Sequence, residues 1–265
     1  MSHSQPSTLD PFSQWALAMP GAPPPRVAWF AQTPMCFVGG WEPLSFRKRA
    51  GYAWTDEEAA CEQEFSETAL ARYQELGATS IVIPFAKGFG LAATRAELDQ
   101  ERDIIQRAHA RGLRAAAYIR VDAVVPETVR AEDPQVDSWL MRGMHGRISS
   151  YNRQQTFRRR ICYSHPGAVA YLESQFRYAV ETLHADQLHL DGYALAATPE
   201  TTCRCPLCVT SYRRWLVGRY PTAEAREQAF GIVDIDSVTP PECERDEHFP
   251  AAIISPDIRS WLRFH

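Results

Sequence analysis

The stretch SIVIPFAKGFGLAATRAELDQERDIIQRAHARGLRAAAYI, residues 80–119, changes from strand to helix and back to strand. Ser80–Phe85 is short and apolar on both faces, as is Leu113–Ile119, and this pattern is typical of buried parallel strands. Between them, Thr94 with Glu97 three residues later predicts a capping box that opens a helix ending at Gly112. Such a unit predicts two parallel strands joined by a right-handed helical crossover.

The same alternation continues on both sides of this unit. Upstream, we predict a strand at Val27–Ala31 and a helix from a Thr55/Glu58 capping box to Gly77, with a buried face formed by Phe65, Ala69, Tyr73 and Leu76. Downstream, a long polar segment spans residues 120–160. Pro166 then starts a helix, a fourth strand covers Gln187–Asp191, and a short helix spans 222–230. The buried stripe of the helix from Pro166 is predicted to be Leu172, Phe176, Val180 and Leu183.

The fold class that follows is α/β with a parallel sheet, either a (β/α) TIM-type barrel or an open doubly wound sheet. The sequence after the first strand has no G-x-G-x-x-G or P-loop motif, which favours the barrel. A complete barrel takes ~250 residues, yet four strands already reach residue 191 of 265, so we expect an incomplete barrel with about four βα units. The expected organisation is a flexible tail at 1–25, the N-terminal portion of the barrel with a metal-binding loop at 26–220, and an extension or truncated continuation at 221–265.

The composition indicates which binding partners and which cellular compartment to expect. The chain is 45% hydrophobic with a net charge of -4, which gives no reason to expect nucleic acid or an anionic membrane as a partner. The sequence contains neither a signal-peptide pattern nor a long apolar run, so we expect a cytoplasmic protein. Seven cysteines, an odd number, favour metal ligands or free thiols over a disulfide framework.

Three of these cysteines form the pattern Cys203-x-Cys205-x-x-Cys208. Thiols at this spacing can converge on one ion, and zinc held by thiolates needs a fourth ligand to complete a tetrahedron. Cys162, in RRRICYSHP, is the best candidate, and four sulfur ligands would make the site structural. The alternative is a group of reduced thiols that lie close together without a metal.

The segment CRCPLCVTSYRRWLVGRYPT, with EQAFG at Glu227–Gly231, resembles the zinc-bearing segment of family 42 glycoside hydrolases, the β-galactosidase A-like barrels. The earlier RRRICYSHP is similar to the family's R-R-R-x-x-C-x-x-S-P region, which supplies the fourth zinc cysteine. The resemblance covers roughly residues 158–231 and implies a glycoside hydrolase with a carbohydrate substrate and a structural Zn²⁺. Related enzymes often assemble into oligomers, so a homo-oligomer is possible here.

The chain departs from this family at the end of the fourth strand. Family members have Asp-Asn-Glu there, the glutamate being the general acid/base, whereas this chain reads Asp191-Gly192-Tyr193. An Asp-Gly at this point, with KGFGL after the strand at 80–85, is similar to hypothetical glycoside hydrolases related to the α-amylase and α-fucosidase barrels. That resemblance implies Asp191 as the nucleophile of a retaining mechanism. From the residues alone, Asp191 could equally cap the following loop.

Other residues at strand ends are candidates for contacting a sugar, because aromatic faces and charged hydrogen-bond donors suit a polyhydroxylated ring. They are Trp29, Lys87, Tyr118, Arg120, Asp122 and Tyr193. Packing in the core is an equal alternative for Trp29 and Tyr118. The second carboxyl group that hydrolysis requires is not identified, although Glu200 and Asp122 are within reach in principle.

Four further residues complete the candidates. We expect a structural role for His109 at a helix end and a capping role for His165, while His145 and Arg147 could reach a pocket from the long loop. Two other classes of function stay open. One is a carbohydrate-binding or scaffold barrel without turnover, and the other is a redox or metal-transfer protein that uses the cysteines.

Overall fold

A computed structural model describes residues 42–51, 57–152, 154–192, 202–231 and 233–240. The predicted tail at 1–25, the strand at 27–31, Trp29, Tyr193 and Glu200 lie outside these residues. The helices are α3 (Leu44–Ala50), α4 (Glu57–Glu64), α5 (Glu67–Glu75), α6 (Arg95–Ala110), α7 (Pro126–Val129), α8 (Pro166–Arg177), α9 (Pro206–Arg219) and α10 (Ala223–Phe230). The strands are β1 (Ser80–Ala86), β2 (Arg114–Arg120), β3 (Ala123–Val124), β4 (Arg159–Arg160) and β5 (Gln187–Asp191).

The main sheet has three strands in the order β1-β2-β5, and both pairs are parallel. The three strands predicted at 80–85, 113–119 and 187–191 are therefore confirmed, as is the α/β class with a parallel sheet. The register sets Tyr118 beside His189 and Arg120 beside Asp191. Among the residues that the structure describes, the strands do not close into a barrel.

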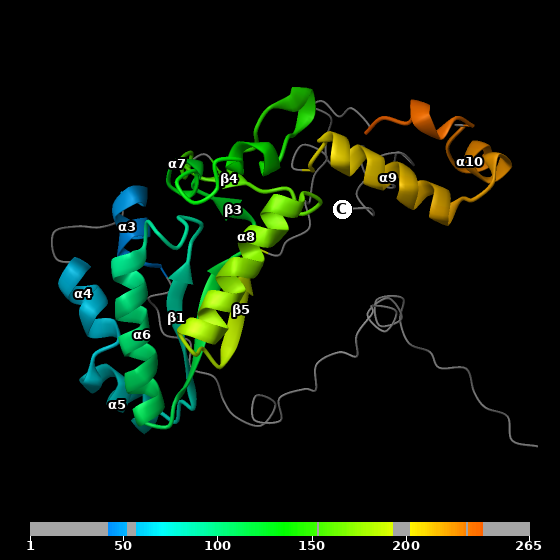
Figure 1. Cartoon of the computed structure of the whole chain (residues 1–265). Helices are drawn as coiled ribbons and strands as arrows, with labels where there is room; N and C mark the ends of the chain where they lie inside the picture. Colours follow the sequence, from blue (N-terminus) through cyan, green and yellow to red (C-terminus); the bar gives the residue numbers. More distant parts are fainter. Residues whose placement is uncertain (1–41, 52–56, 153, 193–201, 232, 241–265) are drawn as a thin grey trace, which may run out of the picture.

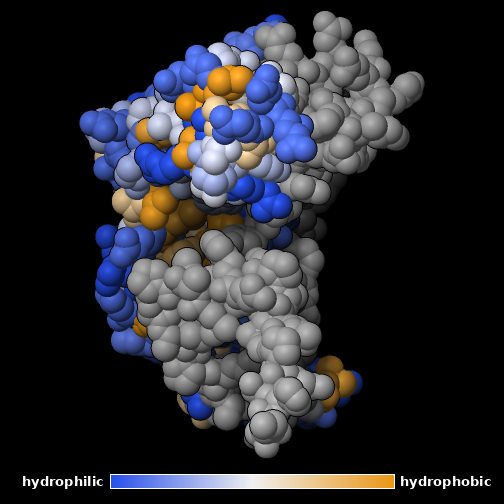
Figure 2. All heavy atoms as spheres, turned by 90° about the vertical axis from the view of Figure 1, so that its right-hand side faces the viewer, coloured by the Kyte–Doolittle hydropathy of each residue, from blue (hydrophilic) through white to orange (hydrophobic). Residues whose placement is uncertain are grey.

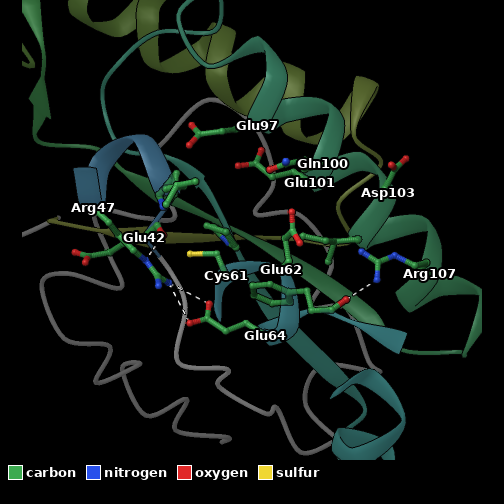
Figure 3. A pocket seen from close by; sticks show the side chains of 15 residues that line it. Glu42, Arg47, Cys61, Glu62, Glu64, Glu97, Gln100, Glu101, Asp103 and Arg107 are labelled. Carbon is green, nitrogen blue, oxygen red and sulfur yellow. Dashed lines mark hydrogen bonds and ion pairs between the residues drawn. The ribbon is translucent and has the colours of Figure 1, made fainter. Parts of the chain in front are cut away.

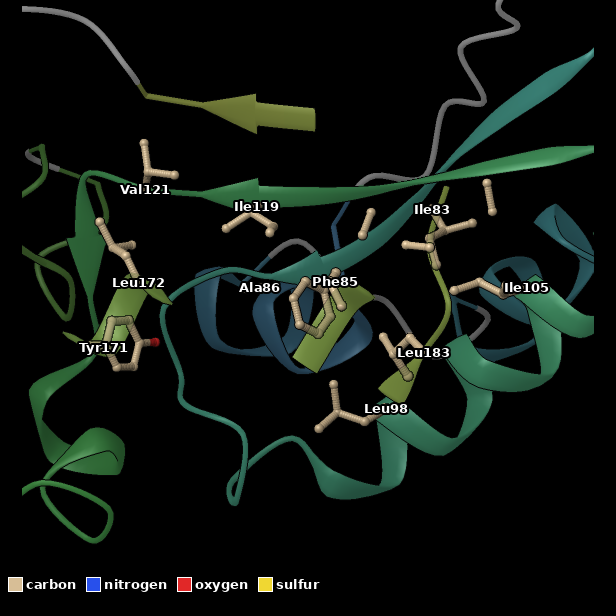
Figure 4. Close-up of a cluster of buried hydrophobic side chains, with 14 of the residues drawn as sticks. Ile83, Phe85, Ala86, Leu98, Ile105, Ile119, Val121, Tyr171, Leu172 and Leu183 are labelled. Carbon is tan, nitrogen blue, oxygen red and sulfur yellow. The ribbon is translucent and has the colours of Figure 1, made fainter. Parts of the chain in front are cut away.

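Helices α6 and α8 cover one face of this sheet (Figure 1). Every second residue of β1 and β2 faces them, including Ile83, Phe85 and Ile119, and these side chains pack on Leu98 and Ile105 of α6 (Figure 4). The core forms here because alternate side chains of the strands and the apolar stripe of α6 point toward each other. The opposite face of the strands carries Val82, Ala116 and Tyr118, which are also buried.

Three details of the helix predictions are wrong. The helix predicted from Thr55 to Gly77 is two helices, because Ser66 starts α5 by accepting a hydrogen bond from Ala69 N at 3.2 Å. Leu76, predicted to be buried, is 68% exposed. A π-helical turn over Tyr178–Thr182 follows α8 and shifts its face, so Val180 points outward and Ala179 is buried instead.

The predicted Thr94/Glu97 capping box is also absent. Thr94 Oγ1 donates to Gly90 O at 2.8 Å, and the Glu97 carboxylate accepts hydrogen bonds from Ser45 N and Oγ at 2.6 and 2.7 Å. The helix itself forms where predicted, as Arg95–Ala110. Glu97 therefore links α6 to α3 rather than closing the start of its own helix.

The polar segment at 120–160 is structured, although no regular element was predicted in it. Strands β3 and β4 pair in antiparallel fashion at the carboxyl end of the main sheet, and Trp139 is fully buried beneath them. Helices α9 and α10 lie beyond this end (Figure 1). The surface of the molecule on this side is mainly hydrophilic, and apolar atoms line a hollow below it (Figure 2). In the described ranges, no helix combines the length and apolar character that crossing a bilayer requires.

Candidate metal centre and strand-end cluster

Four buried cysteines meet between β4 and α9. The Sγ atoms of Cys162, Cys203, Cys205 and Cys208 all lie within 4.8 Å of one another, and Cys162 Sγ is 3.6 Å from that of Cys205 and 3.4 Å from that of Cys208. Four thiolates around one ion at ~2.3 Å would place neighbouring sulfurs ~3.8 Å apart. The predicted convergence of Cys162 on the cysteine motif is thus confirmed, and the group could hold a metal.

Local chain geometry explains how the four thiols converge. Cys205 is the residue before α9 and Pro206 is the first residue of that helix, so Cys208 lies in its first turn. Cys162 is held from the other side, because its N–H donates to Trp139 O at 2.9 Å. Tyr212 and Leu216 of α9 pack against the cysteines and keep them from water.

The four thiols cannot all ionise without a compensating charge. Contacts with Cys203 and Cys205 raise the pKa of Cys162, and contacts with the other three thiols raise the pKa of Cys208. A divalent cation would remove this conflict because it binds the thiolate form. A closed set of four sulfurs is typical of structural zinc or an iron–sulfur centre, so the geometry leaves the identity of the metal open.

The second site is at the carboxyl ends of β2 and β5. Because Arg120 and Asp191 are register neighbours, Arg120 Nη1 reaches Asp191 Oδ2 at 2.6 Å, and the Tyr118 hydroxyl donates to the same oxygen. Arg120 Nε also binds Asp122 Oδ1 at 2.6 Å, and Arg160 Nη1 from β4 binds Asp122 Oδ2 at 2.9 Å. We name this group, with Lys87, the strand-end cluster.

Asp191 is held as a carboxylate in this cluster. Burial alone would raise its pKa, but the hydrogen bond from Tyr118 and the charge of Arg120 outweigh burial and hold the pKa below its ordinary range. Its side chain is 42% exposed, so a ligand can reach it. Gly192 follows with φ +81°, and a Cβ at this position would lie 2.4 Å from Asp122 Oδ1, which explains the glycine.

Lys87 lies after β1 and is almost fully buried in the cluster. Its Nζ is 4.3 Å from the centre of the Tyr118 ring, 5.2 Å from that of Phe46, and 3.7 Å from Glu42 Oε1. Burial lowers its pKa to about 8, although Glu42 opposes this shift. The lysine therefore links the cluster to the segment around α3.

Arg158, Arg160 and Tyr151 were missed by the sequence analysis. The guanidinium carbon of each of Arg120, Arg158 and Arg160 lies 4.4–5.3 Å from the centre of the Tyr151 ring. The antiparallel pairing of β3 with β4 brings them there, and two-residue strands carry no periodic pattern to find. The run Arg158-Arg-Arg160 was the available signal.

The predicted residues divide as follows. Lys87, Tyr118, Arg120, Asp122 and Asp191 come together, whereas Trp29 and Tyr193 lie outside the described residues. His165 caps α8 as predicted, with Nδ1 accepting from Gly167 N at 3.1 Å, and His109 Nε2 lies 2.8 Å from Asp186 Oδ2 at the start of β5. His145 and Arg147 are exposed in the loop after β3.

Comparison with known proteins gives matches in three dimensions alone. No family model matches the chain, and no curated protein matches it. A β-galactosidase from the Antarctic haloarchaeon Halorubrum lacusprofundi aligns with 78% of this chain and 30% of its own chain, at 18% identity and a TM-score of 0.51. β-Galactosidases from Bacillus circulans sp. alkalophilus and Rahnella sp. R3 align with 80% and 82% of this chain and with 29% and 32% of theirs. Their identities are 17% and 16%, and both TM-scores are 0.49.

The chain spans about 30% of the length of the haloarchaeal enzyme. At this identity the likeness concerns the fold and not the reaction. The described part of this chain therefore has the fold of part of a glycoside hydrolase barrel.

Proposed function

We propose that this chain contributes to a retaining glycoside hydrolase, with Asp191 as the nucleophile and the four cysteines as a structural zinc site. The observation that carries the proposal is the carboxyl group of Asp191, accessible at the carboxyl end of β5 and held by Tyr118 and Arg120. Active sites of (β/α) barrels are built at this end of the strands. The substrate would be a carbohydrate bound over the strand-end cluster.

The contacts of Asp191 suit a nucleophile. A retaining enzyme needs a carboxylate that stays deprotonated and is fixed in direction while it attacks the anomeric carbon. Tyr118 and Arg120 hold Asp191 Oδ2, while Oδ1 accepts from Gly192 N at 2.6 Å. These donors would also stabilise the carboxylate when it leaves the sugar in the second step.

The acid/base partner is a separate requirement, and Asp122 is poorly suited to it. Its two carboxylate oxygens already accept hydrogen bonds from Arg120 and Arg160, whereas a general acid carries a proton and faces the leaving oxygen. Asp122 would act by fixing Arg120, which in turn orients Asp191.

The metal would position this end of the sheet. Cys162 follows β4, whose Arg160 contacts Asp122, and the other three ligands belong to α9 and the turn before it. Zinc bound by the four thiolates would fasten α9 to the segment that covers the strand ends. The metal would supply structure and no step of the reaction.

A panel of nitrophenyl glycosides, read by release of nitrophenol, tests this proposal. We expect turnover of at least one glycoside, reduced ~1000-fold or more in Asp191→Asn, because the nucleophile is lost. Asp137→Asn is the matched control, since Asp137 is exposed and pairs with Arg130 at 2.7 Å. Equal turnover by the Asp191→Asn variant would remove Asp191 from the mechanism.

A carbohydrate-binding protein without turnover is the second candidate. It is favoured by the engagement of Asp122, because neither carboxylate of the strand-end cluster is placed to donate a proton. This candidate predicts saturable sugar binding with no nitrophenol release at any pH. A metal-transfer role predicts instead that the four thiols react readily with a thiol reagent in the folded protein.

A further inference from the structure

A cavity lies beside β1, and Glu42 in its wall is 3.7 Å from Nζ of Lys87 in the strand-end cluster. It encloses about 440 Å³ between α3, α4 and α6, with Pro84 of β1 also in its wall. This volume falls within the range of small-molecule sites. Figure 3 shows Glu97 and Glu101 extending from α6 toward α3 across this space.

The cavity wall is strongly acidic. Its charged residues are Glu42, Glu62, Glu64, Glu97, Glu101, Asp103, Arg47 and Arg107. Both arginines are engaged: Arg47 Nη2 binds Glu64 Oε2 at 3.0 Å, and Arg107 Nη1 donates to Phe65 O at 2.6 Å. Neither arginine is among the influences on the Glu101 carboxyl group, whose pKa is shifted by burial and by the charge of Glu97.

Glu101 is the unusual member of this wall. It is 3% exposed, and its Oε2 has no hydrogen-bond partner within the part of the chain that the structure describes. Burial, with the neighbouring charge of Glu97, raises its pKa. A buried carboxylate without a partner is costly whether charged or neutral, because its oxygens lose water and gain no donor.

The wall also has an apolar part that restricts the choice of ligand. Leu44, Phe65 and Ile104 line the same cavity, which suits methylene groups better than a hydrated ion. A metal ion is disfavoured, since among the described residues the four cysteines are the only group of three or more His, Cys, Asp or Glu side chains placed to hold one. A ligand with an ammonium group on a short alkyl chain meets both requirements.

We propose that this cavity binds a small aliphatic amine, with the ammonium group against Glu101 and the alkyl chain against Leu44, Phe65 and Ile104. The ammonium group supplies the donors that Oε2 lacks, and the surrounding carboxylates attract the cation. The cavity adjoins the strand-end cluster at Glu42, but the proposal does not depend on the proposed glycosidase activity.

Calorimetric titration of the full chain with 1,4-diaminobutane tests the proposal, with 1-butanol as the uncharged probe. We expect saturable binding of the diamine with a dissociation constant below ~1 mM and no heat from the alcohol. Glu101→Gln should weaken diamine binding by about tenfold or more, because an amide cannot become the carboxylate that pairs with the ammonium group. Glu173→Gln, an exposed change on α8, is the matched control and should bind as the wild type does.

The location is measured independently in the wild-type protein. In its amide NMR spectrum we expect diamine to shift signals of residues 97–104 in α6, and this readout requires no folded variant. Undiminished binding by Glu101→Gln, absence of saturation, or shifts confined to residues elsewhere would each overturn the proposal.

Discussion

Replacement of Lys87 by methionine should remove a pH dependence of stability that the burial of this lysine creates. Burial lowers the pKa of Lys87 from its ordinary value of 10.5 to about 8. This change corresponds to about 3 kcal/mol, at ~1.4 kcal/mol for each pH unit. The folded protein binds the proton less tightly than the unfolded chain, so the charged lysine destabilises the fold fully below pH ~8 and ceases to do so above pH ~10.5.

The assay is urea unfolding between pH 7 and 10.5, comparing the wild type with Lys87→Met. Subtracting the two free energies of unfolding cancels the titration of the cysteines and tyrosines. The wild type should gain about 3 kcal/mol relative to the variant as pH rises through this window.

Lys48 is the other lysine in the sequence and is exposed in α3, which makes Lys48→Met the matched control. The difference between this control and the wild type should stay constant with pH. The reasoning about Lys87 would be refuted if the difference between the wild type and Lys87→Met were equally flat.

Two further changes test the strand-end cluster. Gly192→Ala should destabilise the protein by ~1–3 kcal/mol in chemical unfolding, because φ is +81° and the new Cβ would meet Asp122, whereas Gly218→Ala meets no atom within 4 Å and should not destabilise it. Tyr118→Phe should raise the pKa of Asp191, measured by carbon NMR of the carboxylate, because a hydrogen bond that favours the charged form is lost. An unchanged pKa would show that the hydrogen bond from Tyr118 does not help to set the charge state of Asp191.

The parallel sheet could be predicted from the sequence for a clear physical reason. Strands covered on both faces are short, continuous apolar runs, and glycines such as Gly77 and Gly112 mark the turns that precede them. The metal site was also predictable, because Cys203, Cys205 and Cys208 are so close in the sequence that their thiols can bind the same ion. Cys162 was found through its own motif.

The parts that sequence reasoning missed depend on tertiary contacts. The π-helical turn that exposes Val180 has no periodic signature, and neither does the two-residue strand β4, which carries Arg160 and directly follows Arg158. Glu101 did leave a signal, since it lies on the same helical stripe as Leu98 and Ile105. A carboxylate on a stripe of buried residues indicates that a polar group or a ligand faces that side of the helix.

Metal content tests most directly whether the four thiols join the segment after β4 to α9 through one structural ion. Elemental analysis of the purified protein should give one zinc for each chain. Cys162→Ser should lose most of this zinc, whereas Cys61→Ser, outside the cluster, should keep it. A folded wild-type protein without metal, or a Cys162→Ser variant with its full zinc content, would contradict the account.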